Sequence, residues 1–296
     1  MLSLAQSSGS LFCVEWVPSE SGPKVIQYKK IKISFDCSTY KNFLDFVLSD
    51  FKTSSLDVSS MLTLSLSINH VGIASFKYDN SIPFDDYTKW YEKQILGKHV
   101  INNYDIYYHK LEYSNNVAMV IYINKELKQN IFDSCEKYGF KIKHLGIDLL
   151  SANVAVNQIY KKKKIKSHIT WKVDRNNIHY LAYFKNNNFK HFLKVKISKN
   201  IDILQYVGSD DFQNAFIEFI SRLLSDKKKS PSFVDAVYIY QVKTDYAFIK
   251  KIVDENEKIN LMDIGSHFLV KNKNNNINYS LLGFNEVGNS LKGIDV

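Results

Sequence analysis

Glycine is scarce in this sequence, with 11 residues among 296, and proline is rarer, with 4. Loops that cradle phosphate depend on glycine, because its backbone can turn several N–H groups toward one anion. The low count therefore limits how many such loops the chain can contain. Cysteine is also scarce, and Cys13, Cys37 and Cys135 form an odd set without close spacing. Cys13 and Cys135 lie in apolar patterns, so we expect buried thiols and a reducing compartment.

Arginine is nearly absent, although the formal net charge is +9. The few arginines (Arg175, Arg222) are too few for a surface that reads bases and phosphates, so we expect no nucleic-acid partner. The lysine-rich composition is compatible with the anionic cytoplasmic leaflet of a membrane. The 8 histidines show no close spacing typical of metal ligands, so no metal site is predicted.

Long apolar runs are absent as well. No segment approaches the roughly 20 apolar residues of a membrane-spanning helix. The first ten residues, MLSLAQSSGS, lack the basic and apolar regions of a signal peptide. With 45% hydrophobic and 23% charged residues, the chain is expected to be globular and cytoplasmic, with one large or two medium domains.

The segment from Val117 to Ser151 has the clearest pattern in the chain. An apolar run, VAMVIYI, precedes an amphipathic stretch and a second strand-like stretch, FKIKHLGI. Asn124 is expected to cap the intervening helix and Gly139 to end it, with Leu127, Ile131, Phe132, Cys135 and Tyr138 on its buried stripe. The pattern predicts a right-handed βαβ unit. Asp148 would then follow a parallel strand, where α/β proteins place ligand chemistry.

The remaining first half predicts strands over 2–5, 11–17 and 25–35, and a helix over 39–51 capped by Ser38. Leu62 to Ile68 alternates Leu with Ser, which predicts a half-buried strand in a hairpin with 71–78. A helix is expected from Asp85 to Leu96, ending at Gly97, and a strand over 104–112. The Trp90/Tyr91 side of that helix is expected to pack in a core, with a partner groove as the alternative.

The second half predicts strands over 169–173, 178–184 and 189–197, then an amphipathic helix over 210–225. Asp210 and Asp211 are expected to cap that helix. A strand over 233–240, a helix over 245–254 and a strand over 259–264 follow. Lys161 to Lys164 is the expected boundary between the halves, and its simplest interpretation is a solvated linker.

The two halves repeat one plan, in which antiparallel strands are followed by a helix and then by alternating strands and helices. This plan resembles the actin-like ATPases. The segment from Leu62 to Ala155 resembles one branch, the PilM-like proteins of type IV pilus assembly with the related cytoplasmic domains of secretion-system L proteins. The similar stretches are FDDYTKWYEKQIL and the strand, helix and strand that lead to Asp148 and Ala155.

The resemblance implies an α/β fold with two ribonuclease H-like lobes, each a mixed sheet flanked by helices. It places the first lobe at 1–160, an inserted α/β subdomain in it at about 57–115, and the second lobe at 165–296.

The resemblance also implies where a nucleotide site would lie. The first phosphate loop of the family reads Asp-x-Gly-Ser-x-x-x-Lys. The matching positions here are Ala5, Ser7 and Phe12, with Ser8 and Gly9 as weak remnants. Alanine cannot replace the carboxylate of the aspartate, and phenylalanine cannot replace the ammonium group of the lysine. This loop is therefore interpreted as degenerate.

The other nucleotide motifs of the family are also incomplete. Asp174 keeps the aspartate of the second loop without its glycine, and Gln241-Val242-Lys243 stands where the adenosine loop has Gly-Gly. The acidic residue expected shortly after Asp148 is Leu150. Asp148 is expected to cap a helix and Asp174 to belong to a turn. No catalytic residue, cofactor or metal is therefore expected.

The predicted function is a non-enzymatic cytoplasmic scaffold, a pseudo-ATPase peripheral to the inner membrane. It would bind the cytoplasmic tail of a bitopic pilus or type II secretion protein, and a homo-oligomer is left open. The alternative is an active actin-like ATPase or sugar-kinase-type phosphotransferase that uses ATP and Mg²⁺. A ribonuclease H-like nuclease would need several carboxylates that converge on two metals, and Ala5 and Leu150 argue against it.

Overall fold

The structure is a computed structural model that describes residues 2–7, 10–17, 24–32, 37–54, 61–111, 116–159, 165–174, 177–198, 200–224, 233–241, 257 and 259–261. The chain divides into two compact units. Unit 1 comprises Met1–Val71, Asn124–Lys161 and Asp263–Val296, and unit 2 comprises Gly72–Ile123 and Lys162–Met262. The lobe boundaries expected from the sequence stay a prediction.

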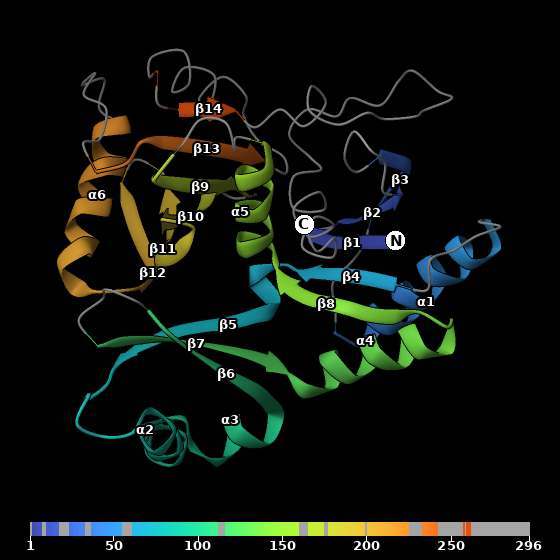
Figure 1. Cartoon of the computed structure of the whole chain (residues 1–296), viewed down its shortest axis with the longest axis horizontal. Coiled ribbons are helices and arrows are strands. Elements are labelled where there is room, and N and C mark those ends of the chain that lie inside the picture. Colours follow the sequence, from blue (N-terminus) through green and yellow to red (C-terminus); the bar gives the residue numbers. More distant parts are fainter. Residues whose placement is uncertain are drawn as a thin grey trace. The chain divides into compact units, whose positions relative to one another are not determined.

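Unit 1 contains a five-stranded mixed sheet in the order β3-β2-β1-β4-β8 (Figure 1). The first three strands form antiparallel pairs, whereas β4 pairs in parallel with both β1 and β8. The strands are β1 (Leu2–Ser7), β2 (Ser10–Val17), β3 (Lys24–Lys32), β4 (Met61–Leu66) and β8 (Lys141–Ile147).

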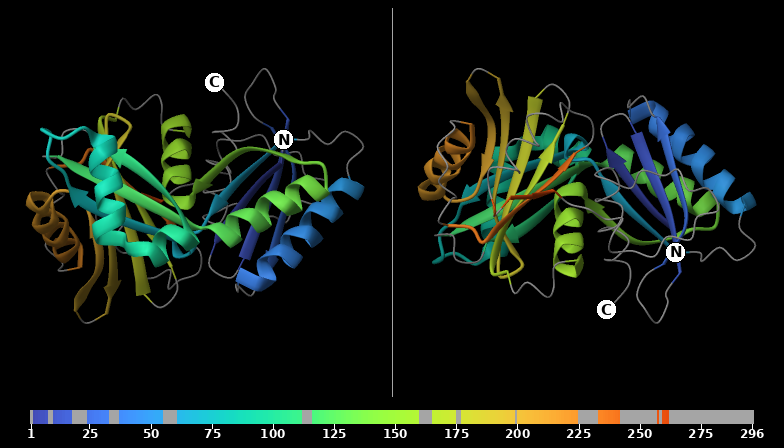
Figure 2. Two further views of the ribbon diagram at one scale, coloured as in Figure 1. Left: turned by 90° about the horizontal axis from the view of Figure 1, so that it is seen from below. Right: turned by 90° about the horizontal axis from the view of Figure 1, so that it is seen from above.

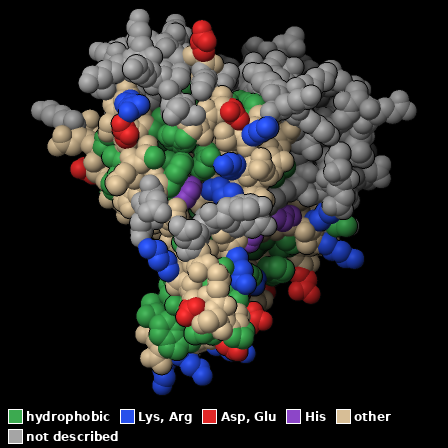
Figure 3. Space-filling model, turned by 60° about the vertical axis from the view of Figure 1, so that its left-hand side comes forward, with side chains coloured by type: hydrophobic (Ala, Val, Ile, Leu, Met, Phe, Trp, Pro, Cys, Tyr) green, Lys and Arg blue, Asp and Glu red, His purple; other side chains and the backbone are tan. Residues whose placement is uncertain are grey.

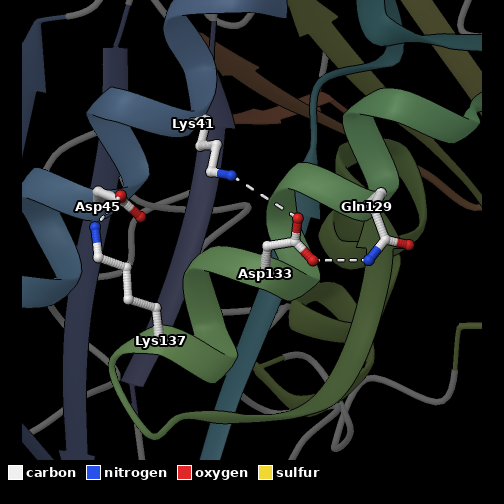
Figure 4. Close-up of polar contacts among 5 residues, drawn as sticks. All are labelled: Lys41, Asp45, Gln129, Asp133 and Lys137. Atoms are coloured by element: carbon white, nitrogen blue, oxygen red, sulfur yellow. Dashed lines mark hydrogen bonds and ion pairs between the residues drawn. The ribbon is translucent and has the colours of Figure 1, made fainter.

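Two helices of unit 1 pack side by side on one face of this sheet, as Figure 2 shows, and they are α1 (Cys37–Ser54) and α4 (Lys125–Lys137). Two polar contacts join them (Figure 4). Lys137 Nζ donates to Asp45 Oδ2 at 2.7 Å, and Lys41 Nζ lies 3.8 Å from Asp133 Oδ2. As predicted, Asn124 caps α4, since its Oδ1 accepts the N–H of Leu127 at 3.0 Å, and Gly139 has a left-handed φ of 76°.

The helix α5 (Asp148–Ile159) packs on the face of the sheet that carries small and hydroxyl side chains. Parallel neighbours in register point to the same face, so this face carries Ser3, Ala5, Thr63 and Ser65, all fully buried. Ser65 Oγ lies 3.0 Å from Ser151 Oγ of α5, which identifies the covering helix. The prediction of a half-buried β4 was therefore wrong. Its serines are buried because a helix covers them.

Unit 2 contains a six-stranded sheet in the order β12-β11-β10-β9-β13-β14. Leaving out β12, it repeats the plan of the first sheet, with β11, β10 and β9 antiparallel and with β13 and β14 added in parallel. Its elements are β9 (Ser167–Val173), β10 (Ile178–Lys185), β11 (Asn188–Ile197), β12 (Ile201–Val207), α6 (Asp210–Leu224), β13 (Ala236–Gln241) and β14 (Ile259–Leu261). The predicted inward side chains Phe216, Phe219 and Ile220 of α6 belong to the core of this unit.

A three-stranded sheet, in the order β5-β7-β6, also belongs to unit 2. Its strands are β5 (Val71–Lys77), β6 (Tyr104–Lys110) and β7 (Val117–Asn124). Between β5 and β6 the chain forms α2 (Phe84–Tyr91), a π-helical turn η2 (Glu92–Leu96) and α3 (Gly97–Asn103). The sheet is anchored to β12, because the side-chain amide of Gln205 donates to the carbonyl of Ile73.

Two strand pairings predicted from the sequence were wrong. The strands at 117–124 and 141–147 lie in different sheets, so they form no βαβ unit with α4. The predicted hairpin of β4 with β5 does not form either, since a short 3₁₀ turn η1 (Ile68–His70) carries the chain from one sheet to the other. In each case the strands themselves were predicted correctly, whereas the strands with which they pair were not.

Smaller differences concern single residues and one strand. The first helix begins at Cys37, so Ser38 is not its cap. Phe132 of α4 is 42% exposed rather than buried. The strand β12 was not predicted. The expected helix over 245–254, the linker Lys161 to Lys164 and the tail from Lys271 lie outside the described residues.

Candidate functional site

The carboxyl ends of β1, β4 and β8 meet at one edge of the sheet in unit 1. Because these three strands are parallel and in register, Ala5 lies beside Ser65, and Ser65 lies beside Gly146. Asp148 follows directly after β8 at this edge, as the sequence predicted. This is the place where open α/β sheets bind ligands.

Asp148 is fully buried at the start of α5. Its Oδ1 accepts the backbone N–H of Leu149 at 2.8 Å, so part of the carboxylate is engaged by its own helix. A carboxylate at a helix start also interacts favourably with the helix dipole. Asp148 is the first residue of α5 and its carboxylate bonds to the next residue, so it lies in the first turn of the helix and not at the capping position expected from the sequence.

The described positions of the first phosphate loop lie in the antiparallel ladder of β1 with β2. Ala5 is fully buried and lies opposite Phe12, while Ser7 pairs with Ser10 at the end of the β1–β2 ladder. Ser8 and Gly9 lie outside the described residues. A methyl group at position 5 can neither coordinate a cation nor orient a water molecule.

A buried hydroxyl pair lies at the same edge and was not identified from the sequence. Ser65 and Ser151 lie within hydrogen-bonding distance of each other, and Ser151 Oγ also donates to the carbonyl of Ile147 at 3.1 Å. Both serines serve to fix α5 on the sheet. The alternation of Leu and Ser in β4 was the available signal, but it was interpreted as solvent exposure.

Asp174 lies in unit 2 at the end of β9, where it belongs to the turn between β9 and β10. Its N–H donates to the carbonyl of Ile178 at 2.9 Å, and its side chain is 4% exposed. Asn177, within that turn, has a left-handed φ of 56°. These contacts agree with the turn role predicted for Asp174.

Two lysines flank one aromatic ring on one face of the sheet in unit 2. Lys172, Tyr180 and Lys194 are in register across β9, β10 and β11. Lys172 is fully buried, and its Nζ lies 5.6 Å from the ring centroid of Tyr180; the Nζ of Lys194 lies 5.4 Å from it. The sequence does not predict this row, because single lysines in strands carry no distinctive spacing.

The cysteines for which side chains are described have no catalytic setting. Cys13 and Cys135 are buried free thiols, as predicted. Burial raises the pKa of Cys135 to about 12, so its nucleophilic thiolate is not formed at neutral pH.

Within the described residues, no group of three or more His, Cys, Asp and Glu side chains is arranged to hold a metal ion. None of the helices in that part of the chain has the length and apolar character that a membrane span requires.

The two large sheets define the class of fold. Each has three antiparallel strands extended by two parallel ones, with β12 added antiparallel to β11 in unit 2, and the three-stranded subdomain is inserted between β4 and β8. This is the actin-like ATPase fold, with two ribonuclease H-like lobes and an inserted α/β subdomain. The structural similarity that supports it is to a chain of a "PilM-PilN type IV pilus biogenesis complex", with a TM-score of 0.65 at 9% identity, covering 100% of this chain and 98% of that chain. The predicted PilM-like resemblance is confirmed at the level of fold.

Two further solved structures match over most of the chain at lower scores. The cytoplasmic domain of EpsL, an inner membrane component of the type II secretion system of Vibrio cholerae, has a TM-score of 0.46 at 9% identity, covering 98% of this chain and 94% of that chain. An inorganic polyphosphate/ATP-glucomannokinase from Arthrobacter sp. has a TM-score of 0.45 at 6% identity, covering 99% and 97%. No family model matches the sequence, and no curated protein matches it.

Enzymes of this fold class hold nucleotide with Mg²⁺, which requires carboxylates and a glycine-rich backbone cradle. At the β1–β4–β8 edge the described side chains supply the methyl group of Ala5 and the buried carboxylate of Asp148. They also supply the hydroxyls of Ser65 and Ser151, which lie within hydrogen-bonding distance of each other. This donor set does not fit a nucleotide–metal group.

Proposed function

We propose that this chain is a non-enzymatic scaffold of an inner-membrane assembly of the type IV pilus or type II secretion kind. It binds the cytoplasmic tail of a bitopic membrane protein and works at the cytoplasmic face of the membrane. Its phosphate-loop positions, Ala5, Ser7, Ser8, Gly9 and Phe12, are degenerate, so neither nucleotide binding nor turnover is part of this role.

The observation that carries the proposal is the full-length similarity to a chain of the PilM–PilN complex. Similarity over the whole chain means that both lobes and the inserted subdomain are retained. The donor set around Ala5 and Asp148 adds support, because a scaffold needs the architecture without the phosphate clamp. Fold similarity at this identity supports a class of function and names no partner.

The proposal is tested with peptides. Fluorescein-labelled peptides that carry the cytoplasmic tails of bitopic inner-membrane proteins from the same genome are titrated with the full chain, and anisotropy is measured. We expect one tail to bind with a micromolar dissociation constant and its scrambled version not to bind. Equal binding of authentic and scrambled tails, or no binding of any tail, would contradict the scaffold role.

The alternative is an active phosphotransferase or ATPase, and the row of Lys172 and Lys194 on either side of Tyr180 is the observation that favours it. Two ammonium groups on one face of a sheet are chemistry suited to a phosphate. A coupled assay of ATP turnover tests this alternative. Turnover above background that is lost in Asp148→Asn and in Lys172→Met would favour the enzyme over the scaffold.

A further inference from the structure

The strand β6 is an edge strand of the three-stranded sheet in the inserted subdomain, where it lies beside β7 alone. The helix α2 covers one face of this sheet. Its Tyr91 is buried against Phe76 as predicted, whereas Trp90, also expected in the core, is 48% exposed. On β6 itself Tyr107 is 45% exposed and His109 is exposed. In the lower part of Figure 3, where Figure 1 places this subdomain, hydrophobic side chains reach the surface. The edge formed by β6 is therefore accessible to solvent.

Every other edge strand of the described sheets has a feature that hinders pairing with a further strand. The strands β3, β8 and β12 each have one extra residue relative to their neighbour, at Ile26, Lys143 and Leu204. Such bulges bend a strand and protect its edge. The strand β14 has only three residues. On β5 the carbonyl of Ile73 already accepts the side-chain amide of Gln205.

The strand β6, by contrast, is regular over its length. It has seven residues and no proline. The ring of Tyr108 lies 6.1 Å from that of Phe76, and the ring of Tyr104 lies 5.7 Å from that of Tyr122, which covers Gly72. Gly72 and Phe76 are four residues apart in β5, so they share a face of the sheet. Tyr104 and Tyr108 therefore share a face as well, and no extra residue interrupts β6 between them.

The backbone groups on the outer edge of β6 include those of Ile106 and Tyr108. The N–H of Leu111, directly after β6, donates to the carbonyl of Val117 at 2.9 Å, so residue 111 bonds toward β7. Alternate residues of an antiparallel ladder bond to the same side, so residues 106 and 108 point away from β7. Within the described residues, neither of them makes a backbone hydrogen bond outside the sheet. Their N–H and C=O groups can therefore pair with an added strand.

We propose that two copies of this chain associate through β6, with the two strands antiparallel about a two-fold axis at Tyr107. Tyr107 is the middle residue of β6, so this register pairs all seven residues. It places Ile106 of one copy opposite Tyr108 of the other, and both of these residues direct their backbone groups outward. Asp105 then lies opposite His109 of the second copy, where an imidazole N–H can donate to the carboxylate. The inference goes beyond the proposed function and does not depend on it.

Sedimentation equilibrium of the full chain tests the proposal. We expect the wild-type chain to form a dimer with a micromolar dissociation constant. Tyr107→Lys places two ammonium groups opposite each other on the two-fold axis, and like charges directly opposite destabilise a strand pair. This variant should raise the dissociation constant at least tenfold. Ile203→Lys is the matched control on the edge strand β12, where Ile203 is 41% exposed, and it should leave the constant within twofold of wild type.

A charge exchange tests the register. His109→Glu places a second carboxylate opposite Asp105 and should raise the dissociation constant at least fivefold. The double variant Asp105→Lys/His109→Glu places a lysine opposite each glutamate and should return the constant to within twofold of wild type. A merely structural effect of His109→Glu would not be reversed by a second substitution four residues away.

Three results would overturn the proposal. The first is a wild-type chain that stays monomeric at concentrations up to about 100 μM, including the case in which Tyr107→Lys weakens only the binding of a tail peptide. The second is a dimer that Tyr107→Lys affects no more than Ile203→Lys does, because the contact would then lie elsewhere. The third is a double variant that dimerises no better than His109→Glu alone, which would exclude the register.

Discussion

At the scale of single residues, the contact between Lys137 and Asp45 joins α4 to α1 (Figure 4). Burial raises the pKa of Asp45, but the hydrogen bond and the charge of Lys137 outweigh it, so the pKa lies below its ordinary value. Lys137→Met should therefore raise the pKa of Asp45, measured by carboxyl NMR titration. Lys41→Met is the control and should change it less, because Lys41 pairs with Asp133 instead. An unchanged pKa in Lys137→Met would contradict the assignment.

Three buried histidines make the stability of unit 2 depend on pH. Burial lowers the pKa of His168, His179 and His191 to about 4, from an ordinary value of 6.5. Between these values the unfolded chain binds more protons than the folded one, so stability falls as pH falls from 6.5 to 4. The loss should be on the order of 2 kcal/mol per histidine at pH 5. Urea denaturation at pH 7.5, 6 and 5 measures it.

His179→Gln tests one of these three contributions. Trp171 Nε1–H donates to His179 Nδ1 at 3.0 Å, and a glutamine oxygen can accept the same bond without titrating. The variant should keep its stability at pH 7.5 within about 1 kcal/mol and lose about a third of the acid sensitivity. An acid sensitivity equal to that of wild type would show that His179 is not one of the groups responsible.

At the scale of elements, α5 lies close to its sheet because the residues between them are small. Ala152 and Ala155 follow Ser151 on the same side of α5 and are fully buried. Ala155→Leu should destabilise the chain by about 1–3 kcal/mol, since added methylene groups have no space. Val154, only partly buried on the same helix, provides the control, and Val154→Leu should cost less. Equal stability of both variants in thermal unfolding would contradict close packing of α5.

The sequence indicated elements far better than it indicated their partners. The amphipathic stripes of α4 and α6 and the left-handed Gly139 are local signals, and each was confirmed except for Phe132 of α4, which is exposed. The pairings of β7 with β8 and of β4 with β5 were wrong, because pairing depends on contacts between distant segments that periodicity does not encode. β12 was missed because Ile203 and Leu204 are adjacent, exposed and flanked by a bulge, which removes the alternation typical of a strand.

The candidate site was predicted as far as single positions allow. Asp148 after β8 and Asp174 in the turn after β9 lie where the sequence placed them. The hydroxyl pair of Ser65 and Ser151, and the row of Lys172 and Lys194, were not predicted. Both sets of contacts depend on which strands and helices are neighbours. They were missed for the same reason that the strand pairings were wrong, because periodicity does not encode contacts between distant segments.

At the scale of the whole molecule, two sheets repeat one topology, while the carboxyl ends of their parallel strands carry different side chains. In unit 1 that edge carries Ala5, the hydrogen-bonded pair of Ser65 and Ser151, and the carboxylate of Asp148 in the first turn of α5. In unit 2 the corresponding turn carries Asp174 without the glycine of the family's loop. If the proposed scaffold role holds, these positions are expected to bind no triphosphate.

Calorimetric titration of the full chain with ATP in excess Mg²⁺ tests this account most directly. The account predicts no saturable heat at ATP concentrations up to about 1 mM. Any binding free energy would then be weaker than about −4 kcal/mol. Saturable one-site binding with a micromolar dissociation constant, abolished by Asp148→Asn, would contradict it.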